Sequence, residues 1–309
     1  MNFLESLFQK KVILLTGKGG IGKSLTAASL SQYAVEHGKK VCLVESNSQE
    51  QLAPLFRQSK IGHNLTEVLP NLHVINLNPQ DNFRDFVVLH LGFAKLFEKV
   101  FTKTLVKSFI NMLPGIAELT LLGRLFYFSE IDEKHDFDHI ILDGFASGHF
   151  LSLLKTPDAV LNSGMVGPVI KETERVKDFI FNQDKVAVAI VTMPEPLIVS
   201  EAVDFAKKFK NELNISHTHV LVNRCLPLSS GEQEALEALQ TEEQAVQYLQ
   251  SRLGRQKESL NQLKRGLAEL EDSGKQPELI LLPDLGAIQE PLVNNFASNW
   301  FANASKDSM

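Results

Sequence analysis

The stretch Gly17–Ser24 reads GKGGIGKS and fits the pattern G-x-x-x-x-G-K-[ST]. In a loop of this kind, successive backbone N–H groups form a concavity that holds phosphate oxygens. The pattern predicts that Lys23 neutralises the β and γ phosphates of a nucleotide and that the Ser24 hydroxyl ligates Mg²⁺. This stretch therefore predicts a phosphate-binding loop.

The segments on either side of the loop agree with that interpretation. Val12–Leu15 is a short apolar run of the kind that is buried in a parallel sheet. Ser24–His37 is rich in helix formers, and Gly38 follows it as an expected helix cap. Strand, glycine-rich loop and helix are the order that phosphate binding requires.

The loop carries a second lysine, Lys18, directly after its first glycine. A phosphate loop does not need this lysine for its own nucleotide. In P-loop enzymes that have it, the side chain reaches across a dimer interface to the phosphates bound by the partner subunit. Lys18 therefore predicts a dimer.

Composition bounds the class of protein. The chain has 309 residues, 44% of them hydrophobic and 22% charged, and a net charge of −6, which argues against a nucleic-acid partner. Its two cysteines, Cys42 and Cys225, lie in apolar runs and are expected to be buried thiols, and no C-x-x-C motif is present. Residues 1–11 lack the pattern of a secretion signal, and no apolar run is long enough to span a membrane, so we expect a cytoplasmic protein.

Apolar, strand-like runs recur along the chain, mostly separated by helical stretches or loops. They are Val12–Leu15, Val41–Val44, Val74–Leu77, His139–Leu142, Val186–Thr192, Val220–Asn223 and Leu279–Leu282. This alternation predicts an α/β fold, a single P-loop NTPase domain over residues 1–309 with a doubly wound, mostly parallel sheet. Asp143 follows one of these runs, at the edge of the sheet where ligands bind.

Two segments depart from this rhythm. Residues 81–130 contain many phenylalanines at helical spacing and predict an inserted α-helical subdomain. Its aromatic side chains either pack helices onto the core or line a hydrophobic groove for a client helix or peptide. Residues 231–274, rich in Glu, Gln, Leu and Arg, predict an exposed helical layer.

Several ordered motifs resemble those of the ArsA-type anion-transporting ATPases, which include the arsenite-pump ATPase and the tail-anchored-protein targeting ATPase. The resemblance covers the chain from about residue 10 to about residue 300. The matching motifs are Lys18–Ser24, Asp143–Leu154, Pro114–Glu118, Val191–Glu195, Val222–Asn223 and Leu282–Leu285.

The resemblance implies an ATPase that binds ATP or ADP with Mg²⁺. Its cofactor-binding positions fall on Gly17, Gly19, Gly20, Ile21, Gly22, Lys23, Ser24, Leu25, Asn223, Pro283 and Leu285. In the family the amide at Asn223 reads the adenine edge, and Pro283 and Leu285 would form a wall of the adenine pocket. Ser24 would ligate Mg²⁺ directly, and Asp143 would hold it through a water. Lys18, Glu45, Asn47 and Asp143 are the catalytic candidates.

The first switch of the family departs from its pattern here, because the water-orienting aspartate falls on Asn47. An amide still hydrogen-bonds a water, but it cannot accept a proton. Positioned acid–base groups contribute about 10²–10⁴-fold, so hydrolysis could be slowed by that order. Glu45, two residues earlier, either substitutes for the aspartate or serves as a structural partner near the loop. The second switch keeps Asp143 and His149 but has lost the family's D-T-A-P sequence, and its metalloid and zinc cysteines are absent, so arsenite extrusion is not expected.

The leading hypothesis is an ATP-dependent dimeric switch whose slow, Mg²⁺-dependent hydrolysis is coupled to a client or partner. The helical subdomain is the candidate surface for a hydrophobic client. The partner is either an identical chain or a second ArsA-like subunit. One alternative is a regulatory subunit that binds nucleotide without significant hydrolysis, paired with an active subunit. Another is a partitioning ATPase of the MinD/ParA type, which shares the second lysine but is disfavoured by the net negative charge and by Pro114–Glu118. The sequence does not identify the client.

Overall fold

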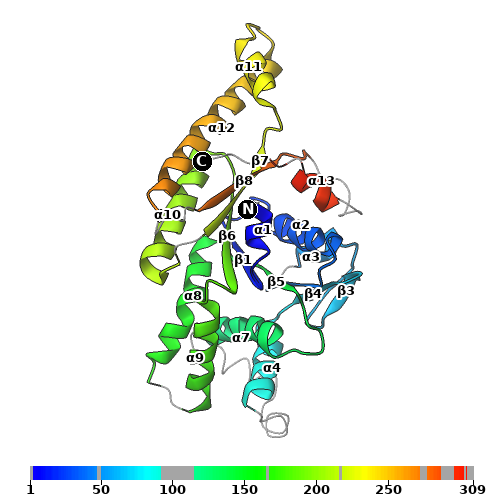
Figure 1. Ribbon diagram of the computed structural model, residues 1–309, viewed down its shortest axis with the longest axis vertical. Helices are drawn as coiled ribbons and strands as arrows, with labels where there is room; N and C mark the ends of the chain where they lie inside the picture. Colours follow the sequence, from blue (N-terminus) through cyan, green and yellow to red (C-terminus); the bar gives the residue numbers. More distant parts are fainter. Residues whose placement is uncertain are drawn as a thin grey trace. The chain divides into compact units, whose positions relative to one another are not determined.

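The computed structural model describes residues 3–46, 50–91, 115–164, 167–215, 218–271, 277–286, 296–302 and 304 (Figure 1). The chain divides into two compact units. Unit 1 comprises Met1–Thr16 and Lys23–Val188, and unit 2 comprises Gly17–Gly22 and Ala189–Met309. Each unit is described by itself below.

The strands form a mostly parallel sheet, which confirms the predicted α/β fold. The strands are β1 (Val12–Thr16), β2 (Val41–Glu45), β3 (Thr66–Leu69), β4 (Leu72–Asn76), β5 (His139–Asp143), β6 (Val186–Thr192), β7 (Thr218–Cys225) and β8 (Glu278–Pro283). The sheet has eight strands in the order β3-β4-β2-β5-β1-β6-β7-β8. Strand β3 is antiparallel to β4, with which it forms a hairpin through Pro70 and Asn71.

The central strands of unit 1 bring their carboxyl ends together. Every residue of β1, β2 and β5 is buried, as expected for strands covered on both faces. The register pairs Leu15 of β1 with Asp143 of β5, and Glu45 of β2 with the same aspartate. Two acidic side chains therefore end neighbouring strands at one edge of the sheet.

Unit 1 carries the helices α1 (Phe3–Leu7), α2 (Lys23–Glu36), α3 (Leu52–Leu55), α4 (Pro79–Leu91), α7 (Ile116–Glu130), α8 (Ser147–Leu161) and α9 (Pro168–Ile180). Helices α4, α7, α8 and α9 pack together (Figure 1). Within the segment predicted as a helical insert, residues 92–114 lie outside the described residues, and with them Phe93, Phe97, Phe101 and Phe109. The described phenylalanines Phe83, Phe86, Phe126 and Phe128 are all buried.

Unit 2 carries α10 (Pro196–Leu213), α11 (Ser230–Ala238), α12 (Gln244–Ala268) and α13 (Phe296–Ala302). Helix α12 packs along α10, and α11 lies against the N-terminal part of α12 (Figure 1). Helix α11 has no buried residue, and a Ser229–Glu232 capping box begins it. None of the described helices of the chain combines the length and apolar character needed to cross a membrane.

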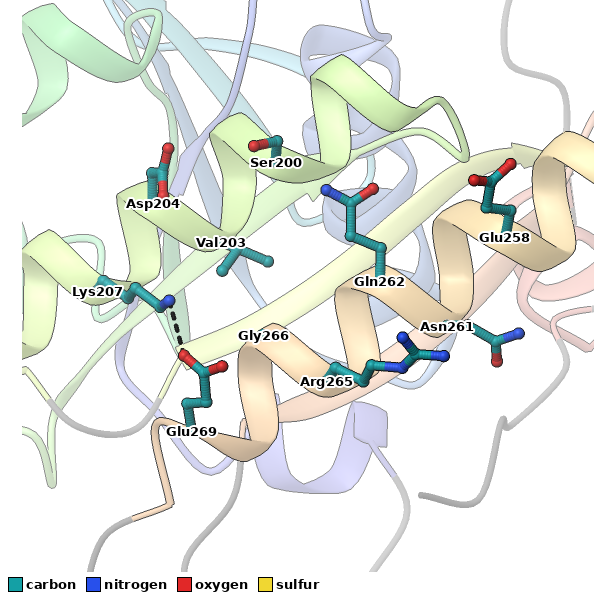
Figure 2. Close-up of a pocket in the computed structure, with 10 residues that line it drawn as sticks. All are labelled: Ser200, Val203, Asp204, Lys207, Glu258, Asn261, Gln262, Arg265, Gly266 and Glu269. Atoms are coloured by element: carbon teal, nitrogen blue, oxygen red, sulfur yellow. Dashed lines mark ion pairs between the residues drawn. The ribbon is translucent and has the colours of Figure 1, made fainter.

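A wide groove of about 820 Å³ runs between α10 and α12 (Figure 2). Its lining is mainly polar and carries charges of both signs, and Lys207 and Glu269 form an ion pair of 2.8 Å within it. The two helices approach closely at Gly266, where an added Cβ would lie 2.5 Å from Cγ1 of Val203. A glycine at this position therefore sets the distance between the helices.

Gly266→Ala is expected to lower the free energy of unfolding by about 1–3 kcal/mol, because the new methyl group must push against the stiff Val203 side chain. Gly254→Ala is the matched control on the same helix, since nothing lies within 4 Å of its missing Cβ. That substitution should stabilise the protein by up to about 1 kcal/mol through helix propensity. Urea unfolding measures both, and equal effects of the two substitutions would contradict the close approach.

Candidate nucleotide-binding site

In unit 1 the site is built around the buried carboxylate of Asp143. This residue ends β5 and is 3% exposed, while Lys23 and Ser24 begin α2. Burial raises the pKa of Asp143, and the nearby Ser24 hydroxyl and the charge of Lys23 partly oppose that rise. Burial also lowers the pKa of Lys23, against the opposing charge of Asp143. A lysine, a hydroxyl and a carboxylate thus face one another at the start of α2.

The Asp143 carboxylate has capacity for a further ligand. Both of its oxygens are buried, and within the described part of the chain neither makes a hydrogen bond of ordinary geometry. A buried charge without a partner is costly, and oxygen ligands are those that Mg²⁺ prefers. Among the described residues, no group of three or more His, Cys, Asp and Glu side chains could hold a metal ion. Asp143 and Ser24 therefore offer oxygen atoms of the kind that could hold a Mg²⁺.

The backbone after β5 passes very close to β1. An added Cβ at Gly144 would lie 2.1 Å from the carbonyl oxygen of Leu15, and the Thr16 hydroxyl donates to the carbonyl of Phe145 at 3.1 Å. The glycine that replaces the threonine of the family's second switch thus stands where this chain has no room for a side chain.

Two glutamates, Glu45 and Glu50, accept hydrogen bonds from backbone N–H groups that follow β2 in the chain. Glu45 is fully buried, and its Oε1 accepts a hydrogen bond from the N–H of Gln51 at 2.6 Å. Glu50 accepts hydrogen bonds of 3.0 Å from the N–H groups of both Ile61 and Gly62. Glu50 could not be singled out from the sequence, because its partners lie in an irregular loop. Asn47, the predicted catalytic position between the two glutamates, lies outside the described residues.

In unit 2 the glycines of the loop are required by close contacts. Gly17 has a φ of +145°, and an added Cβ there would lie 2.2 Å from the carbonyl oxygen of Val191. Gly22 has a φ of +93°, and its Cβ would lie 2.5 Å from Nδ2 of Asn223. Only glycine fits either position without moving the backbone.

Asn223 contacts the loop directly. Its Nδ2 donates to the carbonyl of Ile21 at 2.9 Å, and its Oδ1 accepts from the N–H of Arg224 at 2.8 Å. The residue is 5% exposed. The structure therefore places the predicted adenine-reading amide against the backbone of the phosphate loop.

Lys18 forms an ion pair with Glu201 of α10, at 3.1 Å between Nζ and Oε2. Both side chains are nearly half exposed, at 47% and 41%. Such exposed pairs contribute about 0–1 kcal/mol, so this one is readily exchanged for another partner. Sequence reasoning assigned Glu201 no role, because no spacing rule connects the two positions.

Of the predicted adenine-wall residues, Pro283 ends β8 and Leu285 follows the strand. The carbonyl of Pro283 accepts a hydrogen bond of 3.1 Å from Nε1 of Trp300, and Leu285 is 39% exposed. Between them, Asp284 forms an ion pair with Arg252 of α12. A cavity of about 280 Å³ lies beside this pair, lined by Met193, Pro194, Glu195, Arg224, Tyr248, Arg252, Arg255, Gln256 and Asp284.

Asp143→Asn is expected to raise the free energy of unfolding at pH 7 by on the order of 1 kcal/mol. The folded pKa of Asp143 is raised above its ordinary value of 3.8, so its charged form costs stability as the pH rises past that value. The advantage of the variant should therefore shrink as the pH falls toward 4. Urea unfolding at both pH values measures it.

Asp184→Asn serves as the control for that substitution, because Asp184 is exposed. It should change the stability by less than about 0.5 kcal/mol at either pH. A loss of stability on Asp143→Asn at pH 7 would mean that the folded chain already satisfies this charge, and would contradict the argument for an external ligand.

The chain has relatives among named ATPases. A family described as anion-transporting ATPase matches residues 10–167. A Halobacterium salinarum protein with the provisional name arsenical pump-driving ATPase is 26% identical over 251 residues, which cover 76% of this chain and 38% of that protein. ATPase GET3B of Arabidopsis thaliana is 23% identical over 275 residues, covering 72% of this chain and 66% of that protein. ATPase BagA of Mycobacterium tuberculosis is 25% identical over 244 residues, covering 74% of this chain and 69% of that protein.

The chain spans less than two thirds of the first two of these relatives. The family described above matches just over half of the 309 residues of this chain. The matched part includes the phosphate loop, Glu45 and Asp143. This chain therefore belongs to the ArsA family of anion-transporting ATPases.

Proposed function

We propose that this protein binds ATP or ADP with Mg²⁺ through residues 17–24 and works as a nucleotide-dependent dimeric switch with slow hydrolysis. The observation that carries the proposal is the buried Asp143 carboxylate, which lacks a hydrogen-bond partner of ordinary geometry among the described residues and faces Ser24 and Lys23. Family membership supports ATP as the nucleotide.

Each group of the site has a role in this proposal. The backbone N–H groups of the loop hold the phosphates, and Lys23 neutralises charge on them. Ser24 and Asp143 hold Mg²⁺, which supplies charge stabilisation to the phosphates when bound. The lowered pKa of Lys23 reflects its burial, and an anionic ligand next to it would favour the charged ammonium.

Hydrolysis is slow in this proposal because neither of the two residues at the candidate base positions, Asn47 and Glu45, is suited to accept a proton from water. Asn47 cannot accept a proton from water, whereas an aspartate can. Glu45 is fully buried and already accepts the Gln51 N–H through Oε1. Its first contribution is thus to hold the segment that follows β2.

The dimer is proposed from Lys18. Its ion pair with Glu201 keeps the Lys18 ammonium at the surface. Because such exposed pairs contribute little stability, Lys18 can leave Glu201 for another anion at little energetic cost. In the dimer, Lys18 of one subunit would leave Glu201 for the phosphates bound by the other subunit. Whether the second subunit is identical or a related chain, its phosphates supply the same attraction.

Arsenite is not the proposed cargo. The name of the Halobacterium relative refers to arsenical pumping. In this chain both cysteines are fully or almost fully buried, and burial strongly raises the pKa of the Cys42 thiol. A protonated, inaccessible thiol is a poor metalloid ligand. We propose instead that the nucleotide state controls a protein client or partner, for which the predicted helical subdomain is the candidate surface.

A nucleotide-binding regulatory subunit without significant hydrolysis is the second candidate. The asparagine at position 47 favours it, because binding groups are present while the family's water-orienting aspartate is replaced. A MinD/ParA-type partitioning role is not carried further, since the family match places the chain elsewhere.

The test is phosphate release from MgATP by the purified wild-type protein and by Asn47→Asp, with sedimentation of both in the presence and absence of ATP. We expect slow wild-type turnover, a rise of about 10²-fold or more on Asn47→Asp, and dimerisation that requires ATP. Lys18→Ala should still bind ATP but lose the ATP-dependent dimer.

The other outcomes separate the candidates. Wild-type turnover that is absent but restored by Asn47→Asp would identify the regulatory subunit. Rapid wild-type turnover that is lost on Glu45→Gln would show that Glu45 has replaced the aspartate, against the role assigned to it above. Dimerisation that ignores both ATP and Lys18→Ala would contradict the switch.

A further inference from the structure

We propose that Asn223 is a positioning residue for the phosphate loop, and that helix α12 holds Asn223 in place. The inference rests on the proposed nucleotide binding and adds to the role that the resemblance gives this residue. In this structure one N–H of the amide and one lone pair of its oxygen are used by the chain itself.

The contacts of Asn223 are made within unit 2 and are buried. Its Nδ2 donates to the carbonyl of Ile21 at 2.9 Å, and Ile21 itself is 2% exposed. Without that donor, the Ile21 carbonyl would be a buried acceptor with one partner fewer, a loss that commonly costs more than the bond contributes. Asn223 therefore fixes the backbone at the centre of the loop.

The orientation of the amide is determined on both sides. Its oxygen accepts from the N–H of Arg224 at 2.8 Å, so the NH₂ group must face Ile21 and the amide cannot flip without losing both bonds. Arg224 has a φ of +58°, the left-handed conformation that turns its N–H toward the preceding side chain. The second N–H of the NH₂ group and the second lone pair of the oxygen take part in neither bond, so the positioning role does not exclude a contact with the base.

Helix α12 contacts the backbone that directly follows Asn223. Nη2 of Arg252 donates to the carbonyl of Arg224 at 3.3 Å, and the same side chain pairs with Asp284 at the end of β8. One turn further along α12, Oε1 of Gln256 accepts from the N–H of Leu226 at 2.7 Å. The β7–β8 register shifts between Val222 and Cys225, so regular strand pairing does not fix this point. The two side chains of α12 supply that support.

The two roles predict different losses. A base-reading residue contributes to ATP binding and nothing to the binding of a bare polyphosphate. A residue that positions the loop contributes to every ligand that carries the phosphates, whatever its base. If Asn223 positions the loop, replacing it also alters the loop backbone when no ligand is bound. The inference can therefore be tested separately from nucleotide affinity.

The experiment compares wild type, Asn223→Ala and Arg252→Gln, with Arg255→Gln as the control on the same helix face. Amide hydrogen exchange over residues 17–22 is measured without ligand. Dissociation constants for MgATP, MgGTP and magnesium tripolyphosphate are measured by competition with a fluorescent ATP analogue. Asn223→Ala should speed exchange in the loop and weaken the binding of all three ligands, with that of the base-free tripolyphosphate falling about tenfold.

Arg252→Gln should have a smaller effect of the same kind, and it keeps the inference testable if Asn223→Ala does not fold. Arg255→Gln should match wild type in both measurements. Unchanged loop exchange together with weaker ATP binding but unchanged tripolyphosphate binding would overturn the inference in favour of base reading. Failure of wild type to bind any of the ligands would instead refute the proposed function, while the exchange data would still decide the role of Asn223.

Discussion

A buried carboxylate at the end of β5 is the constraint on which the candidate site in unit 1 depends. Asp143 lies where β1, β2 and β5 end together, shielded from water. Burial raises the pKa of Asp143, because ionising the carboxyl away from water costs free energy. The Ser24 hydroxyl and the charge of Lys23 offset only part of that cost. Active sites commonly retain groups that are unfavourable for the folded chain alone. A hard cation shared with Ser24 would remove the cost, which is the role that we propose for Mg²⁺.

In unit 2 the loop is held by close packing around its glycines. Gly17 lies against the Val191 carbonyl, Gly22 lies against Asn223, and the Asn223 amide in turn depends on Arg224. Through Arg252 and Gln256, α12 reaches this contact, and the same helix carries the exposed α11 at its N-terminal part. Helix α12 is in this account a support of the phosphate loop as well as a covering layer.

Much of the fold could be predicted from the sequence, because strands buried on both faces read as continuous apolar runs and the phosphate loop has fixed spacing. The hairpin strand β3 was missed, since its four residues are only partly buried and carry no apolar run. The sequence also identified Asp143, Lys23 and Ser24, whose roles follow from motif position. It could not reveal the contact of Asn223 with Ile21, which joins residues far apart in the chain and depends on an irregular strand pairing. The Lys18–Glu201 pair was unpredictable for the same reason.

Calorimetric titration with MgATP tests the central claim most directly. Wild type should bind one nucleotide per chain, and the double variant Lys23→Ala with Ser24→Ala should bind at least about 100-fold more weakly, because it loses a phosphate-neutralising charge and a Mg²⁺ ligand. Urea unfolding of the two proteins should show that the variant remains folded. Binding by the folded double variant with wild-type affinity would contradict the claim that residues 17–24 form the nucleotide site.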